Sequence, residues 1–388
     1  MMNLTPLRIG LFLKPFLGWQ GGKEYARNLL MSLQAYEKMR QPGSIEIHLF
    51  AGRSIPDASL EEFRPLAHAI HRLSVDIRRC PQTFFGELKQ QGIDFAFPVH
   101  NTGLGTIRTA DCIFDFQHKY LPTLFSAIDK RERDLSFARI IKYADKVVVS
   151  SETSRADLNK FFPGHDQAVR VLPFTTFPKD EWIAEDPRRV LDLYNLPSRF
   201  FHLSNQFWVH KNHSVVFHAL KKMLDRGLEA NLVCTGSLID YRNSSYMDEL
   251  LSYLHQNGMH PRVRLMGLMP RLDQLQVMRC ALAVLQPSLF EGWSTVLEDA
   301  RTFGKQTLCS SLPVHREQNL PEARFFAPDN PEELAGLMTQ VWQSDRPGFE
   351  AGHEAEAFAK ARERALDFAQ KFHAIAAEPA PLPPGASF

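Results

Sequence analysis

Two glutamates, Glu291 and Glu298, lie in a segment whose residue types and spacing could do chemistry. Residues 281–287 form a short apolar run that predicts a buried strand, and apolar side chains recur at helical spacing over 296–303. The turn between them would place both carboxylates beside the free backbone N–H groups of a helix start, which favour an anion. Because open parallel sheets bind ligands at the carboxyl ends of their strands, this turn predicts a site for a phosphorylated, hydroxyl-rich ligand.

Glu298 has a second interpretation, because Thr295 and Glu298 have the spacing of a capping box. In that arrangement the carboxylate only returns to the backbone N–H of Thr295, and both interpretations stay open. Glu291 precedes the predicted helix and has no such capping role. Glu291 therefore carries more of the ligand prediction than Glu298 does.

The segment resembles a known family in its order of residues: Phe-Glu-Gly-Trp from Phe290, Leu-Glu-x-Ala from Leu297, and Gly-Lys from Gly304. It is similar to the nucleotide-sugar site of the retaining glycosyltransferases of family 4, which have the GT-B fold. In that family seven residues usually separate the two glutamates, whereas six, 292–297, separate them here. The shortening falls in the turn and is expected to alter the loop that touches the donor sugar.

The elements that must position this segment alternate between strands and helices along the whole chain, which predicts doubly wound parallel sheets. Strands are expected at 7–16, 93–97, 111–116, 146–150 and 169–174, and again near 200–204, 231–235, 262–266, 281–287, 306–309 and 323–326. The predicted fold class is α/β of the GT-B type, with two Rossmann-like parallel-sheet domains facing a cleft and a carboxyl-terminal helix that crosses back to the first domain. The predicted parts are an acceptor-binding domain at 1–180, a nucleotide-sugar-binding domain at 190–350, a crossing helix at 351–375 and a disordered tail at 376–388.

Gly21 and Gly22 follow the first predicted strand and begin a helix that is expected to run to about Leu33. Glycines let a phosphate approach the backbone closely, although a tight turn explains the pair equally well. Their spacing differs from the dinucleotide fingerprint G-x-G-x-x-G, which disfavours NAD. The resemblance implies that this is the loop that contacts the diphosphate.

Lys211 and Asn205 follow the strand predicted near 200–204. The family has an arginine and, six positions later, a lysine here, and both cations neutralise the departing diphosphate. Lys211 fits that lysine, whereas Asn205 stands in the place of the arginine. The resemblance then assigns charge stabilisation to Lys211, with a neutral hydrogen bond from Asn205 and help from His210 or His213. An ordinary solvated surface lysine is the other interpretation of Lys211.

His118 closes the apolar run at 112–116, and the resemblance places it near the reacting sugar. A single histidine is usually structural, and Asp115 is expected either to orient His118 or to touch the acceptor. Asp111, Asp115 and His118 would need a helix to share a metal ion, whereas this stretch is predicted as strand and loop. No divalent metal is therefore expected.

Composition limits the class of protein. The chain has 388 residues, enough for two domains, with a mean hydropathy of -0.25. No apolar run reaches the roughly 18 residues of a membrane span, and no signal-peptide pattern is found, so we expect a cytoplasmic protein. Five scattered cysteines predict reduced thiols.

The net charge of +1 argues against a nucleic-acid partner. Residues 1–180 carry 24 lysines and arginines against 19 aspartates and glutamates, whereas 181–388 carry 21 against 25. This basic bias of the first half is the kind of charge that favours an anionic membrane or a lipid-phosphate acceptor. Peripheral association with the inner face of the membrane is therefore a further expectation.

The resemblance implies transfer of a hexose, with retention of configuration, from a nucleoside diphosphate sugar to a glycan, lipid-linked or small-molecule acceptor in cell-surface polysaccharide synthesis. Glu298 would contact the ribose and Glu291 the hydroxyl groups of the transferred sugar. The N–H groups around Ser294 and Thr295 would contact the diphosphate. The sugar nucleotide is a co-substrate, and no cofactor is expected. A sugar-nucleotide epimerase or phosphorylase of the same fold, or a noncatalytic sugar-nucleotide-binding subunit, are the alternatives.

Overall fold

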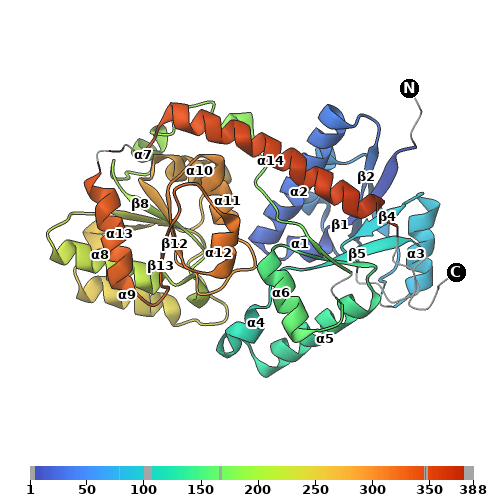
Figure 1. Cartoon of the computed structure of the whole chain (residues 1–388), viewed down its shortest axis with the longest axis horizontal. Helices are drawn as coiled ribbons and strands as arrows, with labels where there is room; N and C mark the ends of the chain where they lie inside the picture. The colour runs from blue at the N-terminus through green and yellow to red at the C-terminus, as the bar shows by residue number, and fades with distance from the viewer. Residues whose placement is uncertain are drawn as a thin grey trace. The chain divides into compact units, whose positions relative to one another are not determined.

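The computed structural model describes residues 5–77, 79–99, 107–165, 168–344, 346 and 348–379 (Figure 1). The chain divides into two compact units. Unit 1 combines residues 1–116, 126–177 and those from Glu363 onward, and unit 2 combines 117–125 with 178–362.

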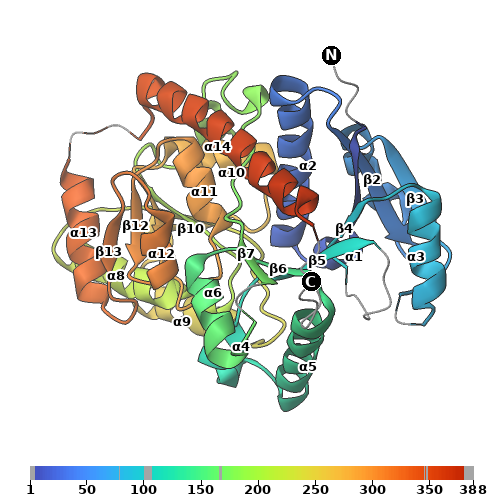
Figure 2. The ribbon, with the colours of Figure 1, turned by 45° about the vertical axis from the view of Figure 1, so that its right-hand side comes forward.

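Unit 1 contains, over its described residues, a parallel sheet of seven strands in the order β3-β2-β1-β4-β5-β6-β7. The strands are β1 (Leu7–Phe12), β2 (Ile45–Gly52), β3 (Ala69–Leu73), β4 (Phe95–Phe97), β5 (Arg108–Ile113), β6 (Lys146–Val149) and β7 (Val169–Val171). The main helices are α1 (Lys14–Leu17), α2 (Gln20–Arg40), α3 (Pro81–Gln90), α5 (Ala127–Tyr143) and α6 (Glu152–Phe161). Helices α2 and α3 lie on opposite sides of the sheet (Figure 2), as expected for a doubly wound unit.

The structure corrects three details of the predictions for unit 1. The first strand ends at Phe12 rather than at residue 16, because Pro15 occupies the first turn of α1. Helix α2 continues to Arg40 instead of ending near Leu33. Strands β2 and β3 were not predicted. The other expected strands of this half are confirmed.

Unit 2 contains, within the described residues, six parallel strands in the order β10-β9-β8-β11-β12-β13. They are β8 (Phe201–Ser204), β9 (Leu232–Thr235), β10 (Val263–Leu265), β11 (Ala283–Gln286), β12 (Thr307–Ser310) and β13 (Arg324–Phe326), and all six were predicted. The helices are α4 (Gln117–Tyr120), α7 (Arg189–Leu193), α8 (His213–Asp225), α9 (Tyr246–Gln256), α10 (Arg271–Cys280), α11 (Thr295–Thr302), α12 (Pro313–Gln318) and α13 (Pro331–Gln343).

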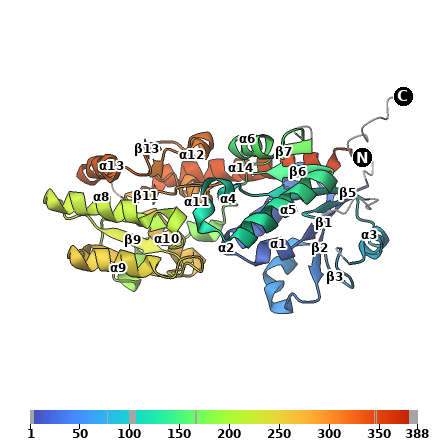
Figure 3. The ribbon, with the colours of Figure 1, turned by 90° about the horizontal axis from the view of Figure 1, so that it is seen from below.

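Both faces of the unit 2 sheet are buried by helices. One core cluster joins the strands to α8, α9 and α13, and α8 lies beside α9 (Figure 3). A second cluster packs α10 and α11 against the other face through Leu275, Leu297 and Ala300. Burial on both faces is seen in the inner strands β8, β9, β11 and β12, in which every residue is buried. The prediction of two Rossmann-like parallel-sheet domains is confirmed.

Helix α14 (Ala351–Ala377) contributes to both units, since residues up to Arg362 group with unit 2 and later ones with unit 1. In unit 1, Arg40 donates to Asp367 at 3.0 Å. The prediction of disorder from residue 376 is wrong at its start, because the helix continues to Ala377 and the carbonyl of Glu378 accepts from Lys146 Nζ at 2.8 Å. Residues 380–388 lie outside the described residues.

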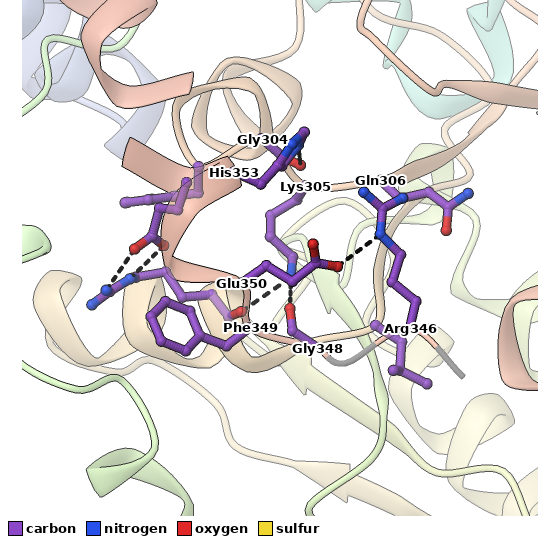
Figure 4. A pocket seen from close by; sticks show the side chains of 12 residues that line it. Gly304, Lys305, Gln306, Arg346, Gly348, Phe349, Glu350 and His353 are labelled. Atoms are coloured by element: carbon purple, nitrogen blue, oxygen red, sulfur yellow. Dashed lines mark hydrogen bonds and ion pairs between the residues drawn. The ribbon is translucent and has the colours of Figure 1, made fainter. Parts of the chain in front are cut away.

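A small pocket lies at the amino edge of the unit 2 sheet, where α11 ends and β12 begins (Figure 4). Lys305 Nζ donates to the carbonyl oxygens of Arg279, at 3.0 Å, and of Gly348. Arg279 in turn pairs with Glu354 through two contacts of 2.7 Å. Burial lowers the pKa of Lys305 to about 8. Lys305, in the Gly-Lys pair that follows α11, therefore has a structural role. Its hydrogen bond to the Gly348 carbonyl holds the segment that leads into α14.

Candidate functional site

Strand β11 leads through a turn into α11, and the start of this helix lies where the sequence predicted it. Ser294 is the N-cap, and its hydroxyl accepts from the backbone N–H of Leu297 at 3.3 Å. The capping-box interpretation of Glu298 is wrong, because the cap lies one residue before Thr295 and Leu297 takes the third helical position. A serine hydroxyl at an extended residue caps the helix without help from Glu298.

Glu298 is buried and holds structural partners of its own. Gln318 Nε2 donates to Glu298 Oε1 at 3.0 Å, and Arg301 Nη2 lies 3.5 Å from the same oxygen. Gln318 also clamps the turn, since Ser294 N–H donates to its Oε1 and its Nε2 donates to the Ser294 carbonyl, both at 3.2 Å. The sequence analysis missed Gln318, which closes α12 and fixes the start of α11. The ribose contact of Glu298 stays a prediction.

Glu291 is the centre of a compact polar cluster at the carboxyl edge of the sheet. Its Oε1 accepts from Lys211 Nζ at 2.6 Å, from Ser288 Oγ at 2.7 Å and from Gln286 Nε2 at 2.9 Å. The glutamate side chain is 9% exposed and the lysine 17%. Within the described part of the chain, the other carboxylate oxygen, Oε2, has no hydrogen-bond partner. The cluster therefore presents one free acceptor atom.

Lys211 reaches Glu291 because two loops are tied together behind them. Lys211 ends the 3₁₀ turn Val209–Lys211, and Asn212 follows with a left-handed φ of 57°. The Asn212 side-chain amide donates to the carbonyl oxygens of Pro287, at 3.1 Å, and Pro328, at 2.8 Å. The interpretation of Lys211 as a solvated surface lysine is wrong, since its ammonium group is largely enclosed and ion-paired. Its role toward a diphosphate stays a prediction.

Asn205 lies near the same cluster but is enclosed. The side chain is 4% exposed, and its Nδ2 donates to Gln286 Oε1 at 2.9 Å. The two nearby histidines are buried and neutral. Burial, with smaller contributions from Lys211 and Arg242, lowers the pKa of His210 to about 2. Burial also lowers the pKa of His213 to about 3. The expected help of these histidines in stabilising negative charge stays a prediction.

His315, in helix α12 after β12, is a further buried neighbour of Glu291. Its Nδ1 lies 2.9 Å from the carbonyl oxygen of Ser310, which fixes the proton on that nitrogen. Burial lowers the pKa of His315, and the nearby Glu291 opposes this shift. The sequence analysis also missed Gln286 and Ser288, and the signal was that polar residues stand at the end of β11 and two residues beyond it.

Gly21 and Gly22 belong to unit 1, in the first turn of α2, so the interpretation as a tight turn is wrong. A Cβ on Gly21 would lie 2.3 Å from the Trp19 ring, and one on Gly22 would lie 2.5 Å from the Phe16 carbonyl oxygen. The close approach of Trp19 to the helix start therefore requires both glycines. This packing leaves the expected diphosphate contact as a prediction.

His118 is buried in the four-residue helix α4, with its ring edge-on to Phe125 at 6.3 Å. Asp115 pairs with Arg133 at 3.1 Å. The role of His118 toward a sugar stays a prediction. Among the described residues, no group of histidine, cysteine, aspartate and glutamate side chains could hold a metal ion. No helix of the described chain is long and apolar enough to cross a membrane.

Comparison with known proteins identifies the class of fold. Residues 194–363, most of unit 2, match the family model described as "Glycosyl transferases group 1". No curated protein matches the chain by sequence.

Solved structures match over almost the full length. HepE from Anabaena, in complex with UDP and glucose, is 14% identical, with 95% of this chain and 99% of that chain covered and a TM-score of 0.67. A glycosyltransferase from Rickettsia africae ESF-5 is 11% identical, with coverages of 96% and 98% and a TM-score of 0.69. Sucrose-phosphate synthase from Thermosynechococcus elongatus is 16% identical, with coverages of 95% and 96% and a TM-score of 0.65. At these identities the likeness concerns the fold, which is GT-B. The fold and the family match support a GT-B glycosyltransferase.

Proposed function

We propose that this chain is a retaining glycosyltransferase of the family 4 type, which moves a hexose from a nucleoside diphosphate sugar to a glycan, lipid-linked or small-molecule acceptor. The observation that carries the proposal is the pair Lys211–Glu291, joined at 2.6 Å beside the start of α11. A cation, a carboxylate with one free oxygen, and a helix N-terminus together suit a diphosphate attached to a hydroxyl-rich group.

The described side chains suggest a division of work within unit 2. Lys211 moves its ammonium from Glu291 toward the diphosphate, and stabilises the negative charge that develops as the sugar leaves. The backbone N–H groups around Ser294 and Thr295 add to this stabilisation. Glu291 Oε2 accepts a hydrogen bond from a hydroxyl of the transferred sugar. Glu298 contacts the ribose after exchanging its present partners for the ligand.

The remaining parts of the proposal rest on the family resemblance. Gly21 and Gly22 contact the diphosphate, and His118 contacts the reacting sugar. The acceptor attacks from the face of the leaving group, whose phosphate takes the acceptor proton, so no protein nucleophile and no divalent metal are required. We place the protein in the cytoplasm, at the inner face of the membrane, in cell-surface polysaccharide synthesis. The basic first half of the chain supports this placement.

A panel of sugar nucleotides tests the proposal. Thermal unfolding of the full chain is followed with UDP, GDP, TDP and ADP sugars, since a ligand that binds the native state raises the melting temperature by mass action. UDP-glucose is the first candidate because HepE is known in complex with it. Release of the nucleoside diphosphate with candidate acceptors then measures transfer. Binding without release would indicate the noncatalytic subunit, and interconversion of the donor sugar would indicate an epimerase.

A further inference from the structure

A chain of buried amides leads to the candidate sugar-binding carboxylate. Asn205 Nδ2 donates to Gln286 Oε1 at 2.9 Å, and Gln286 Nε2 donates to Glu291 Oε1 at 2.9 Å. Gln286 is completely buried and Asn205 is 4% exposed. Gln286 Nε2 also lies 3.2 Å from Ser288 Oγ, which itself donates to Glu291. The four side chains form one connected network around a single carboxylate oxygen.

Asn205 reinforces the direction of this network from the end opposite Glu291. An amide can be placed in two orientations, and only its partners decide which end holds the oxygen. The donor on Asn205 attracts the Gln286 oxygen, and this leaves the Gln286 NH₂ group facing Glu291. The reverse orientation would place an amide oxygen against the carboxylate, where two acceptors repel each other. Asn205 and Glu291 therefore select the same orientation of Gln286, in which its NH₂ group donates to Glu291.

The consequence for Glu291 is a fixed orientation. Among the described residues, the donors Lys211, Gln286 and Ser288 all converge on Oε1, and Oε2 has no partner. When Lys211 turns toward a diphosphate, Gln286 and Ser288 still hold Oε1. The free oxygen then stays in place as the acceptor for a ligand hydroxyl.

We infer that Asn205 and Gln286 are positioning residues for Glu291, and that Asn205 acts through Gln286 rather than by contacting the diphosphate. The inference rests on the proposed function. It assigns a role to the neutral residue that stands where the family has an arginine, and this role concerns recognition of the sugar rather than stabilisation of the leaving group.

A double-mutant cycle on the full chain tests the inference, with the variants Asn205→Ala, Gln286→Met and the combination. The probes are UDP-glucose, or the sugar nucleotide that the panel identifies, and UDP as the sugar-free reference. Gln286→Met should lower kcat/KM for the sugar nucleotide about 10- to 100-fold, since it removes a hydrogen bond to a charged group. The Kd of UDP should change by less than about twofold. Asn205→Ala should also spare UDP, and the double variant should lose no more than Gln286→Met alone.

A second variant keeps the test independent of folding defects. Asn205→Asp places acceptors opposite Gln286 and turns its amide over, so it should reproduce the loss of Gln286→Met with a protein that remains folded by circular dichroism. Gln276→Met is the matched control, since Gln276 donates to the Trp182 carbonyl at 2.9 Å and has no contact with Glu291. It should leave kcat/KM unchanged.

Two results overturn the inference while leaving the proposed function intact. One is additive losses in the double variant, and the other is a Kd of UDP that rises with Asn205→Ala as much as that of the sugar nucleotide. A wild-type protein that neither binds nor uses any sugar nucleotide of the panel overturns the proposed function itself.

Discussion

Replacement of Glu291 by glutamine should separate recognition of the sugar from recognition of the nucleotide. In the native chain Oε1 holds Lys211, Gln286 and Ser288, and Oε2 is free. Glu291→Gln preserves the size of the side chain and an oxygen for these donors. It places an NH₂ group where the free acceptor was, and it removes the negative charge that binds Lys211.

The magnitude follows from the number of contacts changed. One hydrogen bond between a sugar hydroxyl and an ionised carboxylate contributes about 1.5–3 kcal/mol, which corresponds to a loss of about 10- to 150-fold in kcat/KM. The diphosphate should behave in the opposite way. Lys211 lies 2.6 Å from Glu291 in the free protein, so the native chain must weaken this ion pair to bind a phosphate. The variant has no such pair, and its Kd for UDP should be equal to or lower than that of the wild type.

Isothermal titration with UDP and with UDP-glucose, combined with measurement of UDP release, distinguishes the two effects. Asp299→Asn is the matched control, because Asp299 lies on α11, the helix that follows Glu291, and pairs with Arg271 at 2.6 Å. Asp299→Asn also removes one negative charge, but at a residue other than Glu291. It should not change the ratio of the Kd for UDP to the Kd for UDP-glucose. Equal weakening of UDP and UDP-glucose by Glu291→Gln would refute the assignment of Glu291 to the sugar.

Three further predictions concern stability. Glu354→Gln leaves the Arg279 guanidinium, 2% exposed, without its counter-charge, and should lower the free energy of unfolding in urea by about 3–5 kcal/mol; a loss below about 1 kcal/mol would contradict this. Burial lowers the pKa of Lys305 from 10.5 to about 8, so the unfolded chain binds more protons between these values. The stability of wild type relative to Lys305→Met should therefore rise with pH across that window, by at most about 1.4 kcal/mol per pH unit, and a flat difference would exclude the shift. Gly22→Ala places a Cβ 2.5 Å from a backbone oxygen and should cost about 1–3 kcal/mol in thermal unfolding. Gly18→Ala is the control, because a Cβ added there would have no described residue within 4 Å apart from its chain neighbours. It should cost much less, and equal losses would refute the packing argument.

The inner strands of unit 2, β8, β9, β11 and β12, could be predicted because they are short, mostly apolar runs that are buried at every residue. Strands β2 and β3 were missed for a physical reason. Glu46 and His48 interrupt β2, and β3 is the edge strand of its sheet with His71 and Arg72 at its centre. Edge strands need less apolar sequence, because one side of the sheet ends there. Pattern alone therefore identifies the centre of a parallel sheet better than its border.

Lys211 and Glu291 lie close together because of the order of the strands in the parallel sheet, which the sequence pattern implies. They are 80 residues apart, yet they follow β8 and β11, which are neighbours in the sheet. Parallel strands bring their carboxyl ends to one edge, so both loops had to converge there. The partners on Oε1 could not be predicted, because they depend on the side-chain rotamers of Gln286 and Ser288 at the end of a buried strand.

The N-cap of α11 could not be predicted for a different reason. Ser294 and Thr295 are both good N-cap residues, but only Thr295 has a glutamate three positions later, so the pattern favours the residue that is not the cap. Only the backbone decides between them, and here the extended residue is Ser294. The burial of His210 and His213 could not be predicted either, because the segment that follows a strand is usually exposed. The neighbouring aromatic residue Phe207, stacked on His213 at 3.9 Å, was the available signal.

The central claim is that the Lys211–Glu291 cluster binds a nucleoside diphosphate sugar. It is tested most directly by titrating UDP-glucose, and then the other sugar nucleotides of the panel, into wild type and Lys211→Met while UDP release is followed with acceptors. The wild type should bind and turn over at least one donor, and Lys211→Met should lose about 10²- to 10³-fold in kcat with weaker binding of the free nucleoside diphosphate. Lys211→Met with undiminished affinity and turnover, or a wild type that binds no sugar nucleotide, would contradict the claim.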